Sequence, residues 1–324
     1  MTNRIVTAGL IVLLALAGAG ASFASGETEG AAAGTGSATV ITENHGQNAW
    51  DLSAWETATG QTLTLSQAPM LDDMGLPSLE SRLPDEPLVL LPISNLKKVG
   101  TYQDVAWLQD VGPVHHERVM CRKAEHSGQA NQYLRMCQAM ESSNDGRTWT
   151  MTLRKGAKYS DGSEVTTEDV AFFVEDVAQY EPFGVAVTSG SRHVKDAIFE
   201  VIDDYTFSLT YENTNIAEVG RLAEHYHTFH KGYLSQFHPR YAGQAKVDGM
   251  AKEAGFGTAA EFFKKMIDEG EGVPRWNLDL PTMAPWSLKV GAPATTYVHE
   301  RNPYFLAVDA VGQQLPYFDE VRSH

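Results

Sequence analysis

The sequence predicts a mixed α/β or α+β fold, because strand and helix patterns follow one another along its second half. From Trp149 to Leu153, apolar residues alternate with threonines, which is the period of a strand with one buried face. After Thr166 the apolar residues recur with helical spacing, at Val170, Phe173, Val174 and Val177. Two further segments, 198–202 and 205–211, flank Asp203-Asp204, and apolar residues alternate with polar ones in the second, which predicts a hairpin.

Turn and capping signals predict the remaining elements in chain order. Trp50 to Gly60 predicts a short helix, and the four prolines between residues 75 and 92 predict an extended surface segment that leads into Leu88–Leu91. Residues 215–226 read as helix. Thr258 with Glu261 three residues later predicts a capped helix that buries Phe262 and Phe263.

Length and charge bound the class of protein. The chain has 324 residues, a length that is typical of roughly two average domains or one large domain. The formal net charge is −16 with 25 Lys plus Arg, so the sequence lacks the excess of cations that nucleic-acid phosphates and anionic membranes attract. We therefore expect neither nucleic acid nor a lipid surface as a partner.

The N-terminus has the pattern of a secretory signal peptide over residues 1–24. Arg4 precedes an apolar run from Ile5 to Ala17, and Ala21-Ser22-Phe23-Ala24 then places small residues where a signal peptidase cleaves. A membrane anchor is the alternative, but the run is short for a span of about 20 residues. Residues 25–40 then predict a flexible linker, so we expect a periplasmic or extracellular mature chain without a membrane span.

Two cysteines are present, Cys121 and Cys137. In an oxidising compartment an even pair suggests a disulfide, which would stabilise the fold by about 3 kcal/mol. The alternative is a pair of buried thiols.

No catalytic motif stands out in the sequence. It contains no GxxxxGK[ST] phosphate loop, no GxGxxG after a strand and no GxSxG elbow. The histidines His225, His227, His230 and His238 could bind a metal, although solvated or helix-capping roles are the simpler interpretation. The acid pairs Glu175-Asp176 and Asp203-Asp204 are expected on solvated surface.

Aromatic residues in loop-like contexts are candidates for ligand stacking. Trp107 follows Gly100-Thr101-Tyr102, and Trp286 follows Ala284-Pro285. Such side chains offer large, rigid contact area to sugars or peptides. Packing against the domain surface is the alternative for both, whereas Trp149 in its strand is expected in the core.

Several separated segments resemble one family. Residues 145–170, with Asp161-Gly162 at their centre, resemble the signature of the extracellular solute-binding proteins of family 5, the oligopeptide- and dipeptide-binding receptors of ABC importers. The resemblance returns at Arg301–Phe305 and Gly312–Val321, and residues 67–84 look like a branch with a long N-terminal extension. It runs from about residue 67 to the C-terminus, and Asn302-Pro303 looks like a turn before a Tyr304-Phe305 strand.

This resemblance implies a periplasmic-binding-protein-like (type II) α/β lobe with a mixed sheet and an accessory subdomain. We expect an N-terminal extension over residues 41–96 and an incomplete solute-binding domain over residues 97–324, with the second lobe missing. Function would be capture of an oligopeptide, or alternatively an oligosaccharide such as a β-linked glucan, for delivery to ABC permease and ATPase subunits. We expect no catalysis and no cofactor; a secreted metal-dependent enzyme using His225, His227 and His230 is the less favoured alternative.

The resemblance also suggests which residues line the ligand cleft. Tyr102, Trp107 and Trp286 would stack on the ligand, and Gln103 would form hydrogen bonds with it. Two departures from the family pattern stand out. Gln103-Asp104 follow the Gly100-Thr101-Tyr102 element, and His230 and Gly232 replace the Pro and His of a Pro-Lys-His-Tyr-Leu stretch.

Overall fold

A five-stranded antiparallel sheet, ordered β1-β7-β8-β10-β9, is built around β8 (Thr148–Leu153). Trp149, Met151 and Leu153 are buried and the threonines between them are half-buried, which confirms the alternation read from the sequence. The computed structural model describes residues 40–41, 49–91, 101–104, 121–123, 132–186, 191–215, 229–267 and 276–323, all within one unit, Gly36–His324. The other strands of this sheet are β1 (Val40–Ile41), β7 (Cys137–Ser142), β9 (Ile198–Val201) and β10 (Thr206–Thr210).

The predicted hairpin is present as β9 and β10, which pair antiparallel with Phe207 opposite Val201. The predicted helix start after Thr166 is also confirmed. The Thr166 hydroxyl and the Asp169 carboxylate form a capping box at the start of α3 (Thr167–Ala171). This helix continues into the π-helical segment η4 (Phe172–Ala178), in which Gln179 N–H bonds to the carbonyl of Val174 at 2.9 Å.

Further helices follow along the chain. The helix α9 begins after Thr258 with the predicted capping box to Glu261, and it buries Phe262 and Phe263. The predicted helix 215–226 lies outside the described residues except for Asn215. The helices described after η4 are η5 (Glu181–Ala186), α4 (Ser191–Val194), α6 (Lys231–Leu234), η6 (Ser235–Phe237), α7 (Pro239–Ala242), α8 (Gln244–Glu253) and α9 (Ala259–Met266).

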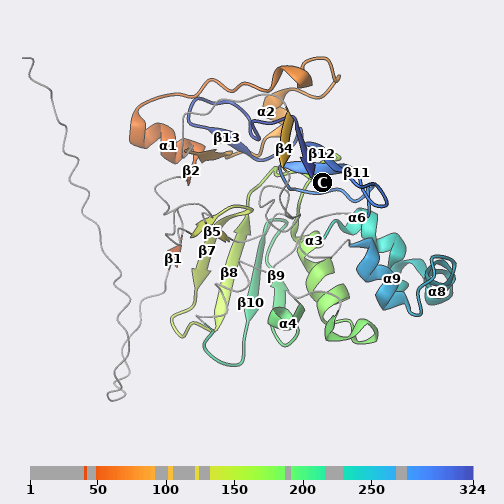
Figure 1. Ribbon diagram of the computed structural model, residues 1–324. Coiled ribbons are helices and arrows are strands. Elements are labelled where there is room, and N and C mark those ends of the chain that lie inside the picture. The colour runs from red at the N-terminus through yellow and green to blue at the C-terminus, as the bar shows by residue number, and fades with distance from the viewer. Residues whose placement is uncertain are drawn as a thin grey trace, which may run out of the picture. The chain divides into compact units, whose positions relative to one another are not determined.

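Two smaller sheets join the beginning of the described chain to its end, and Figure 1 shows them above the five-stranded sheet. In the three-stranded sheet, β3 (Leu88–Leu90) pairs in parallel with β13 (Ala307–Asp309) and antiparallel with β2 (Ala49–Asp51). The four-stranded sheet is mixed, as expected, and has the order β11-β12-β14-β4. Its strands are β4 (Thr101–Asp104), β11 (Trp286–Val290), β12 (Tyr297–Arg301) and β14 (Glu320–Ser323).

Two local predictions are corrected. The proline-rich stretch is not extended throughout: Ser78 caps the short helix α2 (Leu79–Arg82), because its side chain accepts a hydrogen bond from Ser81 N. Nor does a strand begin at Tyr304; a turn occupies Asn302–Tyr304, and strand β13 starts only at Ala307.

The predicted helix near Trp50 is confirmed as α1 (Leu52–Thr59), which ends at Gly60 with φ of 67°. A 3₁₀ turn, η1, covers Pro69–Leu71.

The two cysteines belong to different strands. Cys121 begins β5 (Cys121–Lys123), which pairs with β6 (Gln132–Leu134), and Cys137 begins β7 and is buried. Because the side chain of Cys121 lies outside the described ones, the disulfide stays a prediction.

Among the residues described, no helix combines the length and the apolar character that a membrane span requires.

Candidate ligand-binding site

Three of the four predicted ligand-binding residues lie on the four-stranded sheet. Trp286 begins the edge strand β11, and Tyr102 and Gln103 belong to the opposite edge strand β4. Pairing of β14 with β4 is parallel and places Val321 beside Tyr102 and Arg322 beside Gln103. The fold therefore collects the three residues in one layer, with β12 and β14 between them. Only the backbones of Tyr102 and Gln103 are described, and Trp107 lies outside the described residues, so their ligand contacts stay predictions.

The loop-like setting expected for Trp286 is wrong, because this residue is the first of strand β11. Its side chain is 6% exposed and packs with Val321 and Phe318. Its indole Nε1–H donates to the carbonyl oxygen of Phe318 at 3.0 Å. Trp286 thus packs within the chain, which was the alternative in the sequence analysis, and its contact with a ligand stays a prediction.

Arg301 fixes the segment that leads into β14. It lies opposite Trp286 in the sheet and is 3% exposed. Its guanidinium donates to the carbonyls of Pro316 and Tyr317 and, at 2.8 Å, to Asp319 Oδ1. Burial lowers the pKa of Arg301, although the hydrogen bond to Asp319 opposes this shift. These bonds satisfy a buried cation and hold the loop before β14 in place.

A separate cavity of about 320 Å³ lies where the turn before α3 meets α6. The turn is built on Asp161-Gly162, and Gly162 has φ of 87°, a backbone conformation that favours glycine. Polar and aromatic residues line this cavity: Tyr159, Ser163, Glu164, Thr166, Glu168, Asp169, His230, Lys231, Gly232, Ser235 and Tyr241.

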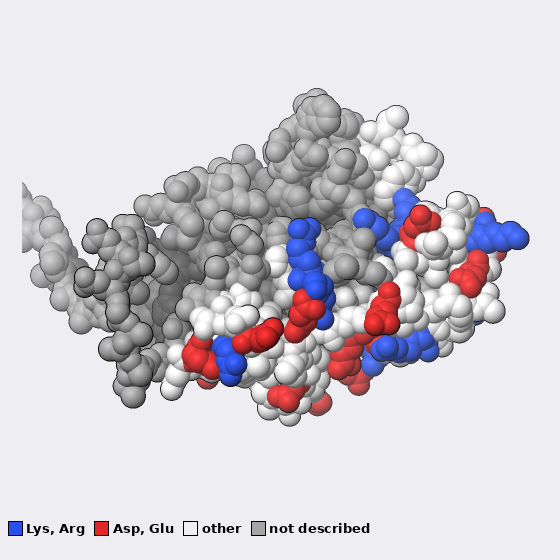
Figure 2. Space-filling model, turned by 90° about the horizontal axis from the view of Figure 1, so that it is seen from below, with Lys and Arg blue, Asp and Glu red and all other residues white. Residues whose placement is uncertain are grey.

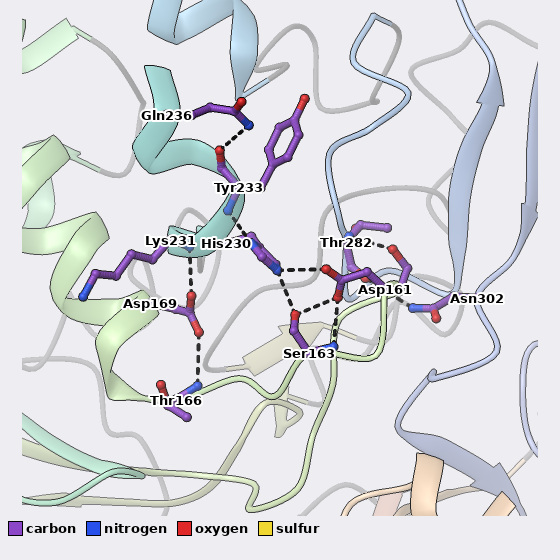
Figure 3. Close-up of polar contacts among 11 residues, drawn as sticks. Asp161, Ser163, Thr166, Asp169, His230, Lys231, Tyr233, Gln236, Thr282 and Asn302 are labelled. Atoms are coloured by element: carbon purple, nitrogen blue, oxygen red, sulfur yellow. Dashed lines mark hydrogen bonds and ion pairs between the residues drawn. The ribbon is translucent and has the colours of Figure 1, made fainter. Parts of the chain in front are cut away.

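His230 connects the two walls of this cavity, the turn at Asp161-Gly162 and the helix α6 (Figure 3). Its Nδ1 accepts a hydrogen bond from Tyr233 N at 2.8 Å and so caps α6. Its Nε2 lies 2.8 Å from Ser163 Oγ and 3.2 Å from Asp161 Oδ2. Although burial acts in the opposite direction, the hydrogen bonds from Ser163 hold the pKa of Asp161 below its ordinary value.

The Ser163, His230 and Asp161 side chains have the composition of a hydrolytic triad but not its polarity. Because Nδ1 accepts from the Tyr233 amide, the proton of a neutral imidazole is on Nε2, which therefore donates toward Ser163 Oγ and Asp161. A general base would have to accept the serine proton at that same nitrogen. The serine hydroxyl instead donates to Asp161 Oδ1 at 2.6 Å. This arrangement links turn to helix and does not activate a nucleophile.

The other described histidine of the predicted cluster is also a helix cap. His238 Nδ1 accepts from Arg240 N at 3.2 Å, and Nε2 donates to the carbonyl of Asp176 at 2.6 Å. Capping, one of the two simpler interpretations, is thus confirmed for His230 and His238. His225 and His227 lie outside the described residues. Within the described part of the chain, no group of three or more His, Cys, Asp or Glu side chains could hold a metal ion.

One acid expected on the surface is buried. Asp176 is 5% exposed and accepts hydrogen bonds from Arg240 Nη1 and from the Tyr241 hydroxyl. The π-helical turn of η4 aims it toward α7, whereas Glu175, Asp203 and Asp204 are exposed as predicted.

On the face that Figure 2 shows, Lys and Arg side chains lie among Asp and Glu side chains, a mixed pattern unlike the basic stripe of a nucleic-acid-binding surface.

Sequence reasoning missed the cavity around Tyr159 and the contact of His230 with Ser163. The available signal was the double departure from the family pattern at His230 and Gly232. A Cβ added to Gly232 would lie 3.0 Å from His230 Cε1, so the imidazole leaves little room for any other residue at position 232.

Comparison with known proteins decides the family. The sequence pattern of the bacterial extracellular solute-binding proteins, family 5 (Middle), matches residues 131–324. The chain belongs to this family. A periplasmic alpha-galactoside-binding protein of Rhizobium meliloti (strain 1021) is 30% identical over 200 residues.

Solved structures of the same kind share the fold of this family 5 chain. The oligopeptide-binding protein OppA superposes with a TM-score of 0.74 at 28% identity over 85% of this chain. The periplasmic binding protein MelB of Agrobacterium fabrum C58, in complex with stachyose, superposes with a TM-score of 0.63 at 24% identity over 80% of this chain. The fold is therefore the predicted periplasmic-binding-protein-like α/β fold. The chain covers 24% of the length of the galactoside-binding relative, 43% of OppA and 40% of MelB.

Proposed function

We propose that the chain is the solute-capturing component of an ABC importer, which binds its ligand outside the cytoplasmic membrane and delivers it to a permease driven by ATPase subunits. The match of the family 5 pattern to residues 131–324 carries this proposal. The acidic charge and the mixed surface charges also suit an exported solute binder better than a nucleic-acid-binding protein.

The proposal includes the absence of catalysis. Its support is the geometry of Ser163 and His230, in which the imidazole nitrogen beside the serine is a donor. Binding with hinge closure requires no nucleophile, whereas it does require a rigid platform on each side of the ligand. The Arg301 network makes the four-stranded sheet such a platform.

An oligopeptide is the first candidate ligand. OppA superposes with a TM-score of 0.74 over 85% of this chain, whereas the stachyose-bound MelB superposes with a TM-score of 0.63 over 80% of this chain. Tyr102 and Gln103 on β4 would then supply an aromatic surface and hydrogen bonds to an extended peptide.

An α-galactoside is the second candidate ligand. The observation that favours it is the 30% identity over 200 residues with the periplasmic alpha-galactoside-binding protein. Aromatic side chains stack on the apolar faces of sugar rings as readily as they contact peptides.

A ligand-dependent thermal unfolding assay on the purified chain separates the two candidates. The ligands are N-acetylated di- to pentapeptides, raffinose, stachyose and a β-linked glucan trisaccharide, each raised until the shift saturates. Saturable stabilisation by peptides alone supports the first candidate, and stabilisation by raffinose or stachyose alone supports the second. If no ligand of either class shifts the transition, the proposal for this chain fails.

Point variants test whether β4 carries the contact. Tyr102→Ala and Gln103→Ala are each expected to weaken the active ligand about tenfold, the loss of roughly 1.4 kcal/mol. Thr101→Ser, on the same strand, is the matched control and should keep the parent affinity. Equal affinity in all three variants would show that the ligand lies elsewhere.

A further inference from the structure

The hydroxyl of Tyr159 is buried without a hydrogen-bond partner among the residues that the structure describes. The side chain is 2% exposed and lines the 320 Å³ cavity between the Asp161 turn and α6. An unmade hydrogen bond at a buried hydroxyl costs free energy, and native structures seldom leave one without an occupant. One residue that lines the cavity, Tyr159, thus has a hydroxyl whose hydrogen-bonding capacity is unused among the described residues.

The position of this hydroxyl is fixed by its neighbours. The Tyr159 ring meets the His230 imidazole edge-on, with ring centroids 4.5 Å apart. His230 is in turn held by Tyr233 N and Ser163 Oγ, both at 2.8 Å. Burial raises the pKa of Tyr159, and the negative charges of Asp169 and Asp161 raise it further, so the hydroxyl stays protonated.

The wall of the cavity carries more negative than positive charge. Glu164, Glu168 and Asp169 line it together with Lys231, whose Nζ bonds to Glu168 at 3.0 Å. Asp169 is 7% exposed and accepts one hydrogen bond on each oxygen, from Lys231 N at 2.9 Å and Thr166 N at 3.2 Å. Each carboxylate oxygen can accept a second hydrogen bond, so acceptor capacity remains at a buried anion.

Gly232 leaves room for the His230 imidazole in the wall of the cavity. It lines the cavity at the second position of α6, and any Cβ there would approach His230 Cε1 to 3.0 Å. Trp286 is not among the described residues that line the cavity, and none of those residues belongs to the four-stranded sheet.

We propose that this cavity is a second ligand site, which binds a small primary ammonium group with the Tyr159 hydroxyl as acceptor and Asp169 as counter-ion. A primary ammonium ion supplies three donors and one positive charge, which matches a cavity lined by a hydroxyl without a partner among the described residues and by a buried carboxylate. A neutral alcohol supplies a donor without the charge, and a quaternary ammonium ion supplies the charge without a donor. The site is independent of the oligomer ligand proposed above.

Three probes of similar size test the two halves of this recognition. Ethylammonium, ethanol and tetramethylammonium are titrated at pH 7 and constant ionic strength, and the NMR signal of the Tyr159 ring is followed. We expect saturable binding of ethylammonium in the roughly millimolar range that such a small ligand allows, and binding at least tenfold weaker for the other two. An equal response to ethanol, or no saturation with any probe, overturns the proposal.

The variant Tyr159→Phe removes only the hydroxyl. Since this hydroxyl has no partner among the described residues, the variant should fold with an unchanged or raised unfolding midpoint, yet bind ethylammonium about threefold to tenfold more weakly. Tyr297→Phe on β12, outside the cavity lining, is the matched control and should bind like the parent. Parent-like binding by Tyr159→Phe would contradict the proposal. N-acetylated peptides and neutral sugars lack a terminal amine, so the result does not depend on the oligomer ligand.

Discussion

Single residues decide how the polar interior of this chain is satisfied, and the two described cluster histidines show it most directly. His230 and His238 both use Nδ1 as a helix cap, which leaves Nε2 as a donor to the rest of the fold. The sequence indicated histidines that could cap or bind metal, but could not give the tautomer. That choice depends on which amide reaches Nδ1, and only the folded chain brings Tyr233 N and Arg240 N there.

Asp176 and Trp286 illustrate the same limit. Patterning assigned Asp176 to the surface because acids on helices are usually solvated, yet a π-helical turn aims it at Arg240 and Tyr241. Trp286 was assigned to a loop because Pro285 precedes it, although proline before a strand is compatible with an edge position. Both errors arise from long-range partners that local pattern cannot show.

The buried His238 gives stability a pH dependence near neutrality. It is fully buried among aromatic rings, and burial lowers its pKa below 6.5 despite the hydrogen bond to Asp176. As the pH falls, His238 of the unfolded chain takes up a proton before His238 of the folded chain does. The contribution of the buried neutral imidazole to the free energy of unfolding is therefore complete above about pH 6.5. It is lost as the pH falls toward the folded-state pKa, at up to about 1.4 kcal/mol per pH unit. Urea unfolding between pH 7.5 and 5 measures this loss.

The variant His238→Asn retains an oxygen that can cap Arg240 N but takes up no proton. It should start from lower stability, since the bond to the Asp176 carbonyl is gone, and should lose less as the pH falls. Parallel profiles for the variant and the parent would assign the pH dependence to other groups. Asp161, with its lowered pKa, contributes in a lower range, below about pH 4.

At the scale of elements, the local signals were reliable where a short stretch contains all the interacting groups. The capping boxes at Thr166 and Thr258 were predicted from spacing, and both form. Strands β8 and β10 follow from alternation in the same way, and the Asp203-Asp204 turn signal places β9 beside β10. The π-helical segment η4 was not predicted, because its apolar spacing satisfies an ordinary helix equally well.

The capping box at the start of α3 is expected to contribute about 1 kcal/mol to the free energy of unfolding. Thr166→Ala removes the acceptor for Glu168 N and should lower the free energy of unfolding by that amount, measured by urea denaturation. Thr258→Ala makes the same change at α9 and should cost a similar amount. Thr62→Ala, at an exposed position outside any helix, is the control and should remain within about 0.5 kcal/mol of the parent. A loss at Thr166 no larger than at Thr62 would contradict the assignment.

At the scale of the whole described unit, the sequence predicted the class of the fold but not how its two ends join. The family-like segments gave the α/β architecture, while residues 41–96 were predicted as an extension. In the structure, β2 and β3 from that stretch form one sheet with β13. Pairings between distant strands leave no trace in local periodicity, so pattern alone could not find them.

Arg82 secures this junction. It is 1% exposed, and its guanidinium donates to the carbonyl of Pro77 at 3.0 Å, to the carbonyl of Pro303 and to Gln67 Oε1. Arg82→Met should cost about 3 kcal/mol because buried acceptors lose their donor. Arg147→Met, which removes a half-exposed arginine paired with Asp145, should cost less than about 1 kcal/mol. Equal losses in urea unfolding would show that Arg82 does not hold the junction.

The parallel pairing of β3 with β13 also sets an order of events during folding. Arg82 and Pro303 are 221 residues apart, so the three-stranded sheet closes a very long loop, whereas β8 pairs with strands close by in the chain. Closure of long loops is slow because of its entropic cost. We expect amides of β8 and β10 to gain protection in pulsed hydrogen exchange before those of β3. A nascent chain would accordingly expose the unpaired edge of β3 until β13 has been synthesised, an interval in which a chaperone could bind that edge.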